Sequence, residues 1–177
     1  HACEQLNFAP DIVHCNDWHT GLLPLLLKTR HAQNPFFQRT RSVISIHNAA
    51  FQGVFDRQQF WAVPEIQDYE QRINYDYGHI NLLKCGVLYA DKINAVSPNY
   101  ASELLTHLGA HGMASVFQQR ASDLRGILNG CDYQDWDPAF DPLLPATYDA
   151  DHLAGKHTCK RALQQETGLP VGNLPIY

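Results

Sequence analysis

The sequence predicts an α/β fold in which helices pack on a parallel sheet. Short β-like runs alternate with helical stretches along the 177 residues, a pattern typical of βαβ units. Apolar residues make up 45% of the chain and charged residues 18%, which fits a globular core and excludes a disordered or charge-laced coiled-coil chain. The length fits one domain, or one domain with a piece of another.

Four short runs rich in β-branched and apolar residues are the expected strands. They cover residues 12–15, 42–46, 92–96 and 126–128. Because helical stretches separate these runs, each connection would cross over the sheet, and the strands would lie parallel to one another.

The segments between the expected strands carry helical signals. Residues 19–30 are rich in leucine, and residues 79–90 place apolar side chains at near-helical spacing. Residues 98–107 follow Ser97, a natural N-cap residue, and begin with Pro98 at the first helical position. We therefore expect a helix in each of these three segments.

The last part of the chain is expected to leave this first domain. Residues 132–150 hold three prolines and few periodic apolar residues, so they are interpreted as a linker that follows a domain of residues 1–131. A helix over residues 151–167, closed by Gly168, would open a second domain within residues 151–177. A new strand could begin in residues 174–177.

The charge and the cysteine content limit which binding partners and which cellular compartment are expected. Lys and Arg total 13 and Asp and Glu total 18, so the formal charge of −5 gives no electrostatic reason to expect nucleic acid or a membrane surface as a partner. Five widely spaced cysteines without a CxxC pair indicate free thiols in a reducing compartment, the cytoplasm. The only methionine is Met113 and the chain begins at His1, so we expect a piece of a longer protein.

Polar clusters follow the expected strands at the point where each strand ends. They are Asn16-Asp17-Trp18-His19, His47-Asn48, Ser97-Pro98 and Asn129-Gly130. In a parallel sheet these positions share one edge, where open α/β sheets bind their ligands. Mixed hydrogen-bond donors and acceptors beside an aromatic ring suit a sugar, whose hydroxyls need both and whose apolar face stacks on a ring.

Each cluster also has a purely structural interpretation. Asp17 could cap the following helix, Trp18 could be a core aromatic residue, and His47 could be a buried, hydrogen-bonded histidine. Asn129-Gly130 could be an ordinary turn, and Ser97 is mainly a helix cap. His107 and His111 have i,i+4 spacing, but the glycines beside them break the helix, so no metal site is expected.

Several ordered segments resemble the glycogen/starch synthases, the bacterial and plastid glucosyltransferases with two Rossmann-like domains of the GT-B type. The matching segments are PDIVHCNDWHTG at residues 10–21, SIHNAAFQG at 45–53, NLLKCG at 81–86 with YAD at 89–91, AVSPNYA at 95–101 and LNGCD at 128–132. Lys156, Lys160 and Gly168 resemble the helix that opens the second domain of this family. The resemblance implies that the chain is part of the N-terminal Rossmann-like domain, with the start of the second.

The chain also departs from the family pattern. Ala114 replaces the usual acidic residue, and Asn16 stands where histidine is common. The lysine-containing KTGGL loop of the first domain and the segment of the second domain that grips the diphosphate are not in these 177 residues.

The resemblance implies retaining transfer of glucose from a nucleotide-glucose, ADP-glucose, to the non-reducing end of an α-1,4-glucan. It implies no cofactor and no metal, and a cytoplasmic enzyme, or a plastid one in a plant. His47 would be the catalytic residue that orients the transferred glucosyl group. The implied substrate-binding residues are Asp17, Trp18, His19, Asn48 and Asn129.

Three other interpretations remain open at this point. The chain could belong to another GT-B glycosyltransferase, or to a non-catalytic glucan-binding or regulatory remnant, which Ala114 would favour. It could also be a Rossmann-type binding domain of another function, because a fold does not fix an activity. In either enzyme reading, these 177 residues alone are expected to be inactive.

Overall fold

The computed structural model describes residues 2–175 and divides the chain into two compact units. The larger unit comprises residues 1–129 and the smaller one residues 130–177, and each is described by itself. The strand suggested for residues 174–177 lies largely outside the described residues.

The larger unit is built on a four-stranded parallel sheet, which confirms the predicted fold class. Its strands are β1 (Ile12–Asn16), β2 (Arg41–Ile46), β6 (Lys92–Ala95) and β7 (Leu124–Gly126), in the order β1-β2-β6-β7. Asn16 lies opposite Ser45, and Ser45 lies opposite Asn94, so three strands end close to the same level. Their carboxyl ends therefore form a single edge.

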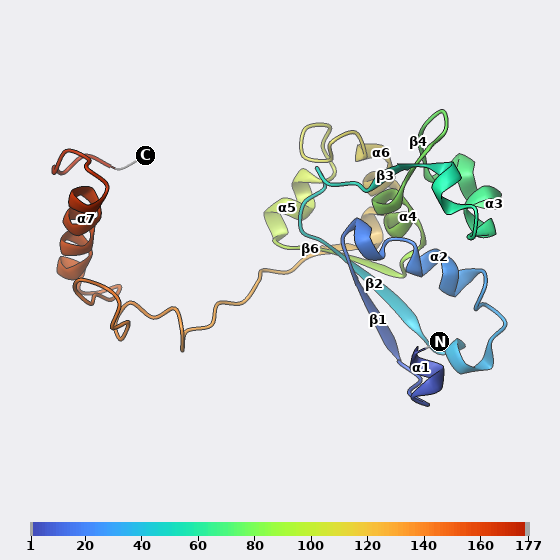
Figure 1. Ribbon diagram of the computed structural model, residues 1–177, viewed down its shortest axis with the longest axis horizontal. Helices are drawn as coiled ribbons and strands as arrows, with labels where there is room; N and C mark the ends of the chain where they lie inside the picture. The colour runs from blue at the N-terminus through green and yellow to red at the C-terminus, as the bar shows by residue number, and fades with distance from the viewer. Residues whose placement is uncertain (1, 176–177) are drawn as a thin grey trace. The chain divides into compact units, whose positions relative to one another are not determined.

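Helices cover the sheet and its ends (Figure 1). They are α1 (Ala2–Gln5), η1 (Trp18–Thr20), α2 (Leu23–Lys28), η2 (Pro35–Phe37), α4 (Leu82–Tyr89), α5 (Pro98–Glu103), α6 (Ala114–Gln119) and η4 (Ala121–Asp123). The main core joins one sheet face, including Ile44, Ile46 and Ile93, to Leu83 of α4 and Phe117 of α6. Burial of these apolar side chains is the main force that holds the helices on the sheet.

A second, antiparallel sheet was not expected from the sequence. It consists of β3 (Val54–Asp56), β4 (Asn74–Asp76) and β5 (His79–Asn81), in the order β3-β5-β4. Between β3 and β4 lie η3 (Arg57–Phe60) and α3 (Pro64–Ile73). A smaller apolar core, including Leu25, Ile66, Ile73, Ile80 and Cys85, lies beneath it.

This sheet shortens the helix expected over residues 79–90. Residues 79–81 pair with β3 instead, and α4 begins at Leu82 because the Asn81 side chain accepts a hydrogen bond from the Lys84 N–H at 2.8 Å. Asn81 is thus the N-cap of α4. The apolar spacing correctly indicated a helix in this segment, but its first three residues, 79–81, form β5.

Three further boundaries differ from expectation. The fourth strand covers residues 124–126 rather than 126–128, because Leu124 is buried while Ile127 and Leu128 are 62% and 71% exposed. The helix expected over residues 19–30 is divided into η1 and α2, and α5 ends at Glu103, short of residue 107. Ser97 is the N-cap of α5, as predicted, since its Oγ accepts the Tyr100 N–H at 2.9 Å.

The smaller unit contains α7 (Ala154–Glu166), inside the helix expected over residues 151–167. Gly168 follows with φ +70°, the left-handed conformation predicted for a residue that closes a helix. Between residue 130 and α7 the chain forms turns, in which the carboxylates of Asp132, Asp137 and Asp141 each accept a backbone N–H two residues on. Among residues 2–175, no helix is long and apolar enough to cross a membrane.

Candidate functional site

The polar clusters after β1 and β2 meet at the carboxyl edge of the sheet. The His47 N–H donates to Asp17 Oδ1 at 2.8 Å, and the His47 ring Nε2 lies 3.0 Å from Asn16 Oδ1. The Asp17 N–H in turn donates to the Ser45 carbonyl at 2.9 Å. The two strand ends are thereby locked together, with an exposed imidazole at the junction.

Asp17 does not cap the following helical turn. No side-chain hydrogen bond from Asp17 reaches η1, and its carboxylate is used on His47 instead. Its backbone has φ +49° and ψ −162°, a region that is nearly restricted to glycine and costs about 1–3 kcal/mol. Strain of this kind persists only where surrounding contacts impose it, which favours a functional interpretation of this turn.

Trp18 is half-buried and packs against both apolar cores. One face of the indole lies on Gly53, whose φ is +62° and where an added Cβ would come within 2.4 Å of the ring. The exposed His19 ring stacks on Trp18 with a centroid separation of 3.9 Å. Trp18 is therefore a core aromatic residue that also presents part of its surface at the edge of the sheet.

Two open hollows flank this junction. The first, about 400 Å³, is lined by His47, Asn48, Val96, Tyr100, Glu103, Gly109 and His111. The second, about 480 Å³, is lined by Trp18, Ala50, Phe51, Gln52, Gly53, Val54, Phe55, Tyr75 and His111. Four of the six predicted site residues therefore lie at the hollows. Trp18, His47 and Asn48 line them, and Asp17 is hydrogen-bonded to His47.

His111, Tyr100 and Gln52 were not among the predicted site residues. His111 borders both hollows and has φ +47°. The Tyr100 hydroxyl accepts the Ala49 N–H at 2.8 Å, and burial raises the pKa of this phenol. Tyr100 and Gln52 lie in AVSPNYA and SIHNAAFQG, two segments that resemble the glycogen/starch synthases, so the sequence carries a signal for both, whereas His111 lies in none of the resembling segments.

Gln52 is a buried residue in the wall of the second hollow. Its Nε2 donates to the carbonyls of Ala49 and His111 at 3.1 and 2.8 Å, and its Oε1 accepts from Asn81 Nδ2 at 2.6 Å. Every polar atom of this amide side chain is satisfied, so a buried network fixes the loop that carries His47.

Of the other two predicted site residues, His19 lines neither hollow but stacks on Trp18, and Asn129 lies apart from both hollows. It is exposed, lines neither hollow, and makes no hydrogen bond to another residue within 2–175. Asn48 has a local role as well, because its side chain accepts the Ala50 N–H at 2.9 Å and shapes the loop after β2.

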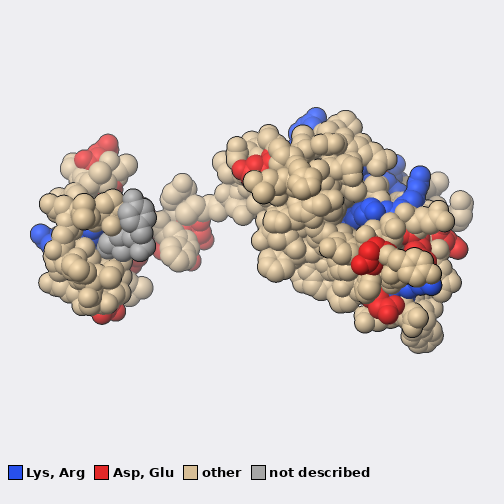
Figure 2. Space-filling view, turned by 90° about the horizontal axis from the view of Figure 1, so that it is seen from above, with Lys and Arg blue, Asp and Glu red and all other residues tan. Residues whose placement is uncertain are grey.

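The charge around the hollows is sparse. Neither lining includes a lysine or arginine. Figure 2 shows large uncharged areas on the larger unit, with basic and acidic side chains gathered mainly toward one side of the view. Within the described residues, no group of three or more His, Cys, Asp or Glu side chains could hold a metal ion.

Comparisons with known proteins give a consistent result. Residues 1–119 match the family model described as the starch synthase catalytic domain. The chain is 89% identical over 177 residues to the glycogen synthase of Aeromonas hydrophila and 55% identical over 179 residues to that of Photobacterium profundum. These alignments cover 100% and 99% of the chain, but it spans only 36% and 35% of the length of those relatives.

A solved structure agrees with the fold. The catalytic domain of starch synthase IV from Arabidopsis thaliana, bound to ADP and acarbose, matches with a TM-score of 0.77 and 28% identity. The match covers 98% of this chain and 36% of the solved one.

Proposed function

The chain belongs to the starch synthase catalytic domain family, and on that premise we propose that it carries the first-domain part of a glycogen synthase active site. The complete enzyme would transfer glucose from ADP-glucose, with retention, to the 4-hydroxyl at the non-reducing end of an α-1,4-glucan. The observation that carries the proposal is the hydrogen-bonded junction of Asp17 and His47, which sets an exposed imidazole in the wall of the first hollow.

In this proposal His47 is the catalytic residue that contacts and orients the glucosyl group. Asp17 fixes the His47 backbone, and its remaining carboxylate oxygen and Asn48 would hydrogen-bond sugar hydroxyls. Trp18 and His19 would form a stacked wall beside the ring of the sugar. Asn129 would bind the substrate if the residues after β7 approached the carboxyl edge of the sheet.

The reaction exchanges one glycosidic bond for another. The bond from the anomeric carbon of the donor to the diphosphate breaks, the bond to the acceptor oxygen forms, and the hydroxyl proton leaves with the diphosphate. The departing diphosphate needs cationic donors, which stabilise charge as it develops. Because neither hollow is lined by lysine or arginine, those cations would come from the remainder of the enzyme, and the 177-residue chain alone would be inactive.

The domain organisation is part of the same proposal. Residues 1–131 would complete the first Rossmann-like domain, residues 132–150 would form the linker, and residues 151–177 would begin the second domain. Closure of the two domains would exclude water from the activated sugar. A cytoplasmic location, with no nucleic acid or membrane as partner, fits a water-soluble donor and a glucan acceptor.

A chimeric enzyme tests the proposal directly. The matching 177 residues of the Aeromonas hydrophila glycogen synthase would be replaced by this chain, and incorporation of labelled glucose from ADP-glucose into glycogen would be measured. We expect activity close to that of the parent enzyme, whereas the purified 177-residue chain should incorporate none. An inactive but folded chimera would instead support a non-catalytic remnant.

Variants of the chimera then test the assigned residue. His47→Ala should lower turnover by orders of magnitude with unchanged circular dichroism. His31→Ala is the matched control, since His31 lines neither hollow, and it should leave turnover unchanged. Near-normal synthesis by the His47→Ala enzyme would contradict the role given to this residue.

A further inference from the structure

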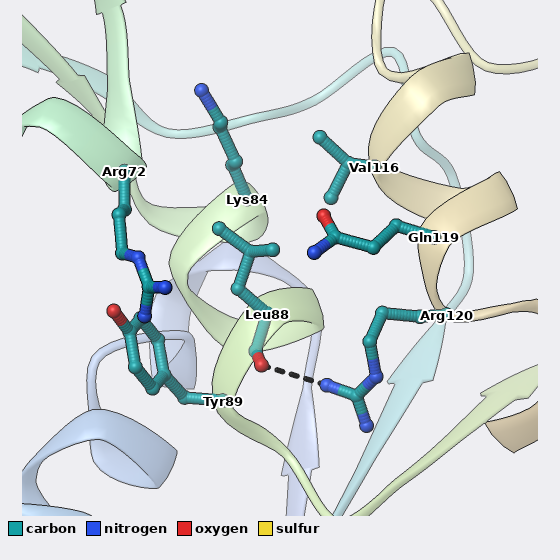
Figure 3. A pocket seen from close by; sticks show the side chains of 7 residues that line it. All are labelled: Arg72, Lys84, Leu88, Tyr89, Val116, Gln119 and Arg120. Carbon is teal, nitrogen blue, oxygen red and sulfur yellow. Dashed lines mark hydrogen bonds between the residues drawn. The ribbon is translucent and has the colours of Figure 1, made fainter.

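A separate pocket lies between α3, α4 and α6, away from the residues that line the two hollows. Its volume is about 240 Å³, and it is lined by Arg72, Lys84, Leu88, Tyr89, Val116, Gln119 and Arg120. Figure 3 shows Arg72 on α3, Gln119 at the end of α6 with Arg120 directly after it, and Lys84 and Tyr89 on α4. No acidic side chain lines this pocket.

Two cationic side chains of this pocket lack a counter-charge. The exposed Arg72 guanidinium forms no hydrogen bond or ion pair with any residue of the range 2–175. Lys84 Nζ donates to the carbonyl and to Oδ1 of Asn74, at 2.9 and 3.3 Å, but it meets no carboxylate among the same residues. Partial burial lowers the pKa of the Lys84 ammonium.

Arg120 has a different role from the other cations. Its guanidinium donates to the carbonyls of Val87, Leu88 and Ala90 at 2.7–2.8 Å and to the Asp123 carboxylate at 3.1–3.2 Å. It thereby covers the carbonyls at the end of α4, which would otherwise repel an anion. Its own charge is neutralised by Asp123, so the net positive charge of the pocket comes from Arg72 and Lys84.

The Tyr89 hydroxyl adds an unsatisfied polar atom. It is buried and has no hydrogen-bond partner among the described residues, a state that costs about 1–3 kcal/mol. Figure 3 shows the Tyr89 ring on the same side of the pocket as the Arg72 guanidinium, with the Gln119 amide reaching in from the opposite side.

We propose that this pocket binds a small anion that carries a phosphate group. The Arg72 guanidinium and the Lys84 ammonium line it, with the Gln119 amide on the opposite side, and the oxygens of a tetrahedral dianion accept hydrogen bonds from donors of these kinds. The volume lies below the range of about 300–1,000 Å³ typical of sites for drug-sized ligands, so the occupant is inorganic phosphate or a short phosphomonoester. The pocket shares no lining residue with the hollows, and binding is measured without any glucosyl transfer, so this inference stands apart from the proposed function.

Calorimetric titration of the 177-residue chain tests the proposal. Inorganic phosphate and glycerol 3-phosphate are the two probes, each added at constant ionic strength against sodium chloride. We expect saturable binding of at least one probe, and the tighter one distinguishes free phosphate from a phosphomonoester. The thermal unfolding midpoint should rise with the same concentration dependence.

Three variants locate the binding. Arg72→Gln should weaken binding at least about tenfold, the effect of losing one charge-assisted hydrogen bond. Tyr89→Phe removes a hydroxyl that is sealed from solvent and has no partner, so it should leave binding unchanged and the unliganded chain at least as stable. Arg39→Gln removes the same charge from an exposed arginine outside the pocket and should bind as the parent does.

Two outcomes would overturn the proposal. One is the absence of saturation with both probes at concentrations where chloride gives the same response. The other is equal affinity of the Arg72→Gln and Arg39→Gln variants, which would mean that phosphate binds by general charge and not in this pocket.

Discussion

Replacing Asp17 by alanine and by glycine separates the strain of its backbone from the hydrogen bond of its side chain. Both substitutions remove the acceptor of the His47 N–H, a contact worth about 1 kcal/mol because it is open to solvent. Only glycine relieves the backbone at φ +49° and ψ −162°, which gains about 1–3 kcal/mol. Glycine loses about 0.5–1 kcal/mol of this through the greater freedom of the unfolded chain.

The glycine variant should therefore be more stable than the alanine variant, by about 1 kcal/mol. At an unstrained helical position the alanine variant is the more stable of the two. Asp68 provides the matched control, because it is exposed in the middle of α3, where glycine should be less stable than alanine by about 1 kcal/mol. The two differences have opposite signs, and about 2 kcal/mol separates them.

Urea unfolding followed by tryptophan fluorescence measures these differences. Trp18 and Trp61 lie in the larger unit and Trp136 in the smaller, so a Trp136→Phe background makes the signal report the larger unit alone. An alanine variant at position 17 as stable as the glycine variant, or more so, would refute the argument that this turn is strained.

Two further perturbations follow from the packing. Gly53→Ala should destabilise the larger unit by about 2–4 kcal/mol, because the backbone strain at φ +62° adds to the displacement of the Trp18 ring. Gly130→Ala is the control and should change stability little, because there is open space around Gly130. Equal unfolding midpoints for the two variants would contradict this. Burial raises the pKa of Cys85 to about 12 from an ordinary 9.0, so the thiol stabilises the fold fully below pH 9 and loses this contribution as pH rises toward 12. Between pH 8 and pH 10 the parent should lose about 1.4 kcal/mol more than Cys85→Ala in urea unfolding, and parallel pH profiles would show that the thiol ionises equally in both states.

The parallel sheet was predictable because its first three strands lie in short runs rich in apolar and β-branched residues. The run at residues 42–46 is buried at four of its five positions, and it lies near the middle of the sheet between β1 and β6. The second sheet was missed because its strands have three residues each, too few to show a period of two. Its pairing depends on a contact between residues 54–56 and 79–81, which no local pattern reveals.

The site was predictable to the extent that it depends on strand ends. Asp17 and His47 come together because their strands are adjacent and in register, which the order of polar clusters indicated. His111 was missed because it arrives from a loop between α5 and α6, held there by Gln52. Asn129 was expected at the same edge, but the strand before it ends two residues early, and its side chain makes no hydrogen bond to another described residue.

The amide of Gln52 also determines how the larger unit opens. It joins the loop after β2 through Ala49, the loop before α6 through His111, and the start of α4 through Asn81, and these three segments are far apart in sequence. No one of these segments can move away from the others without leaving a polar atom of Gln52, which is only 8% exposed, without its partner. The backbone amides of all three segments should therefore exchange their hydrogens with a single opening free energy, so that the walls of both hollows form one cooperative unit.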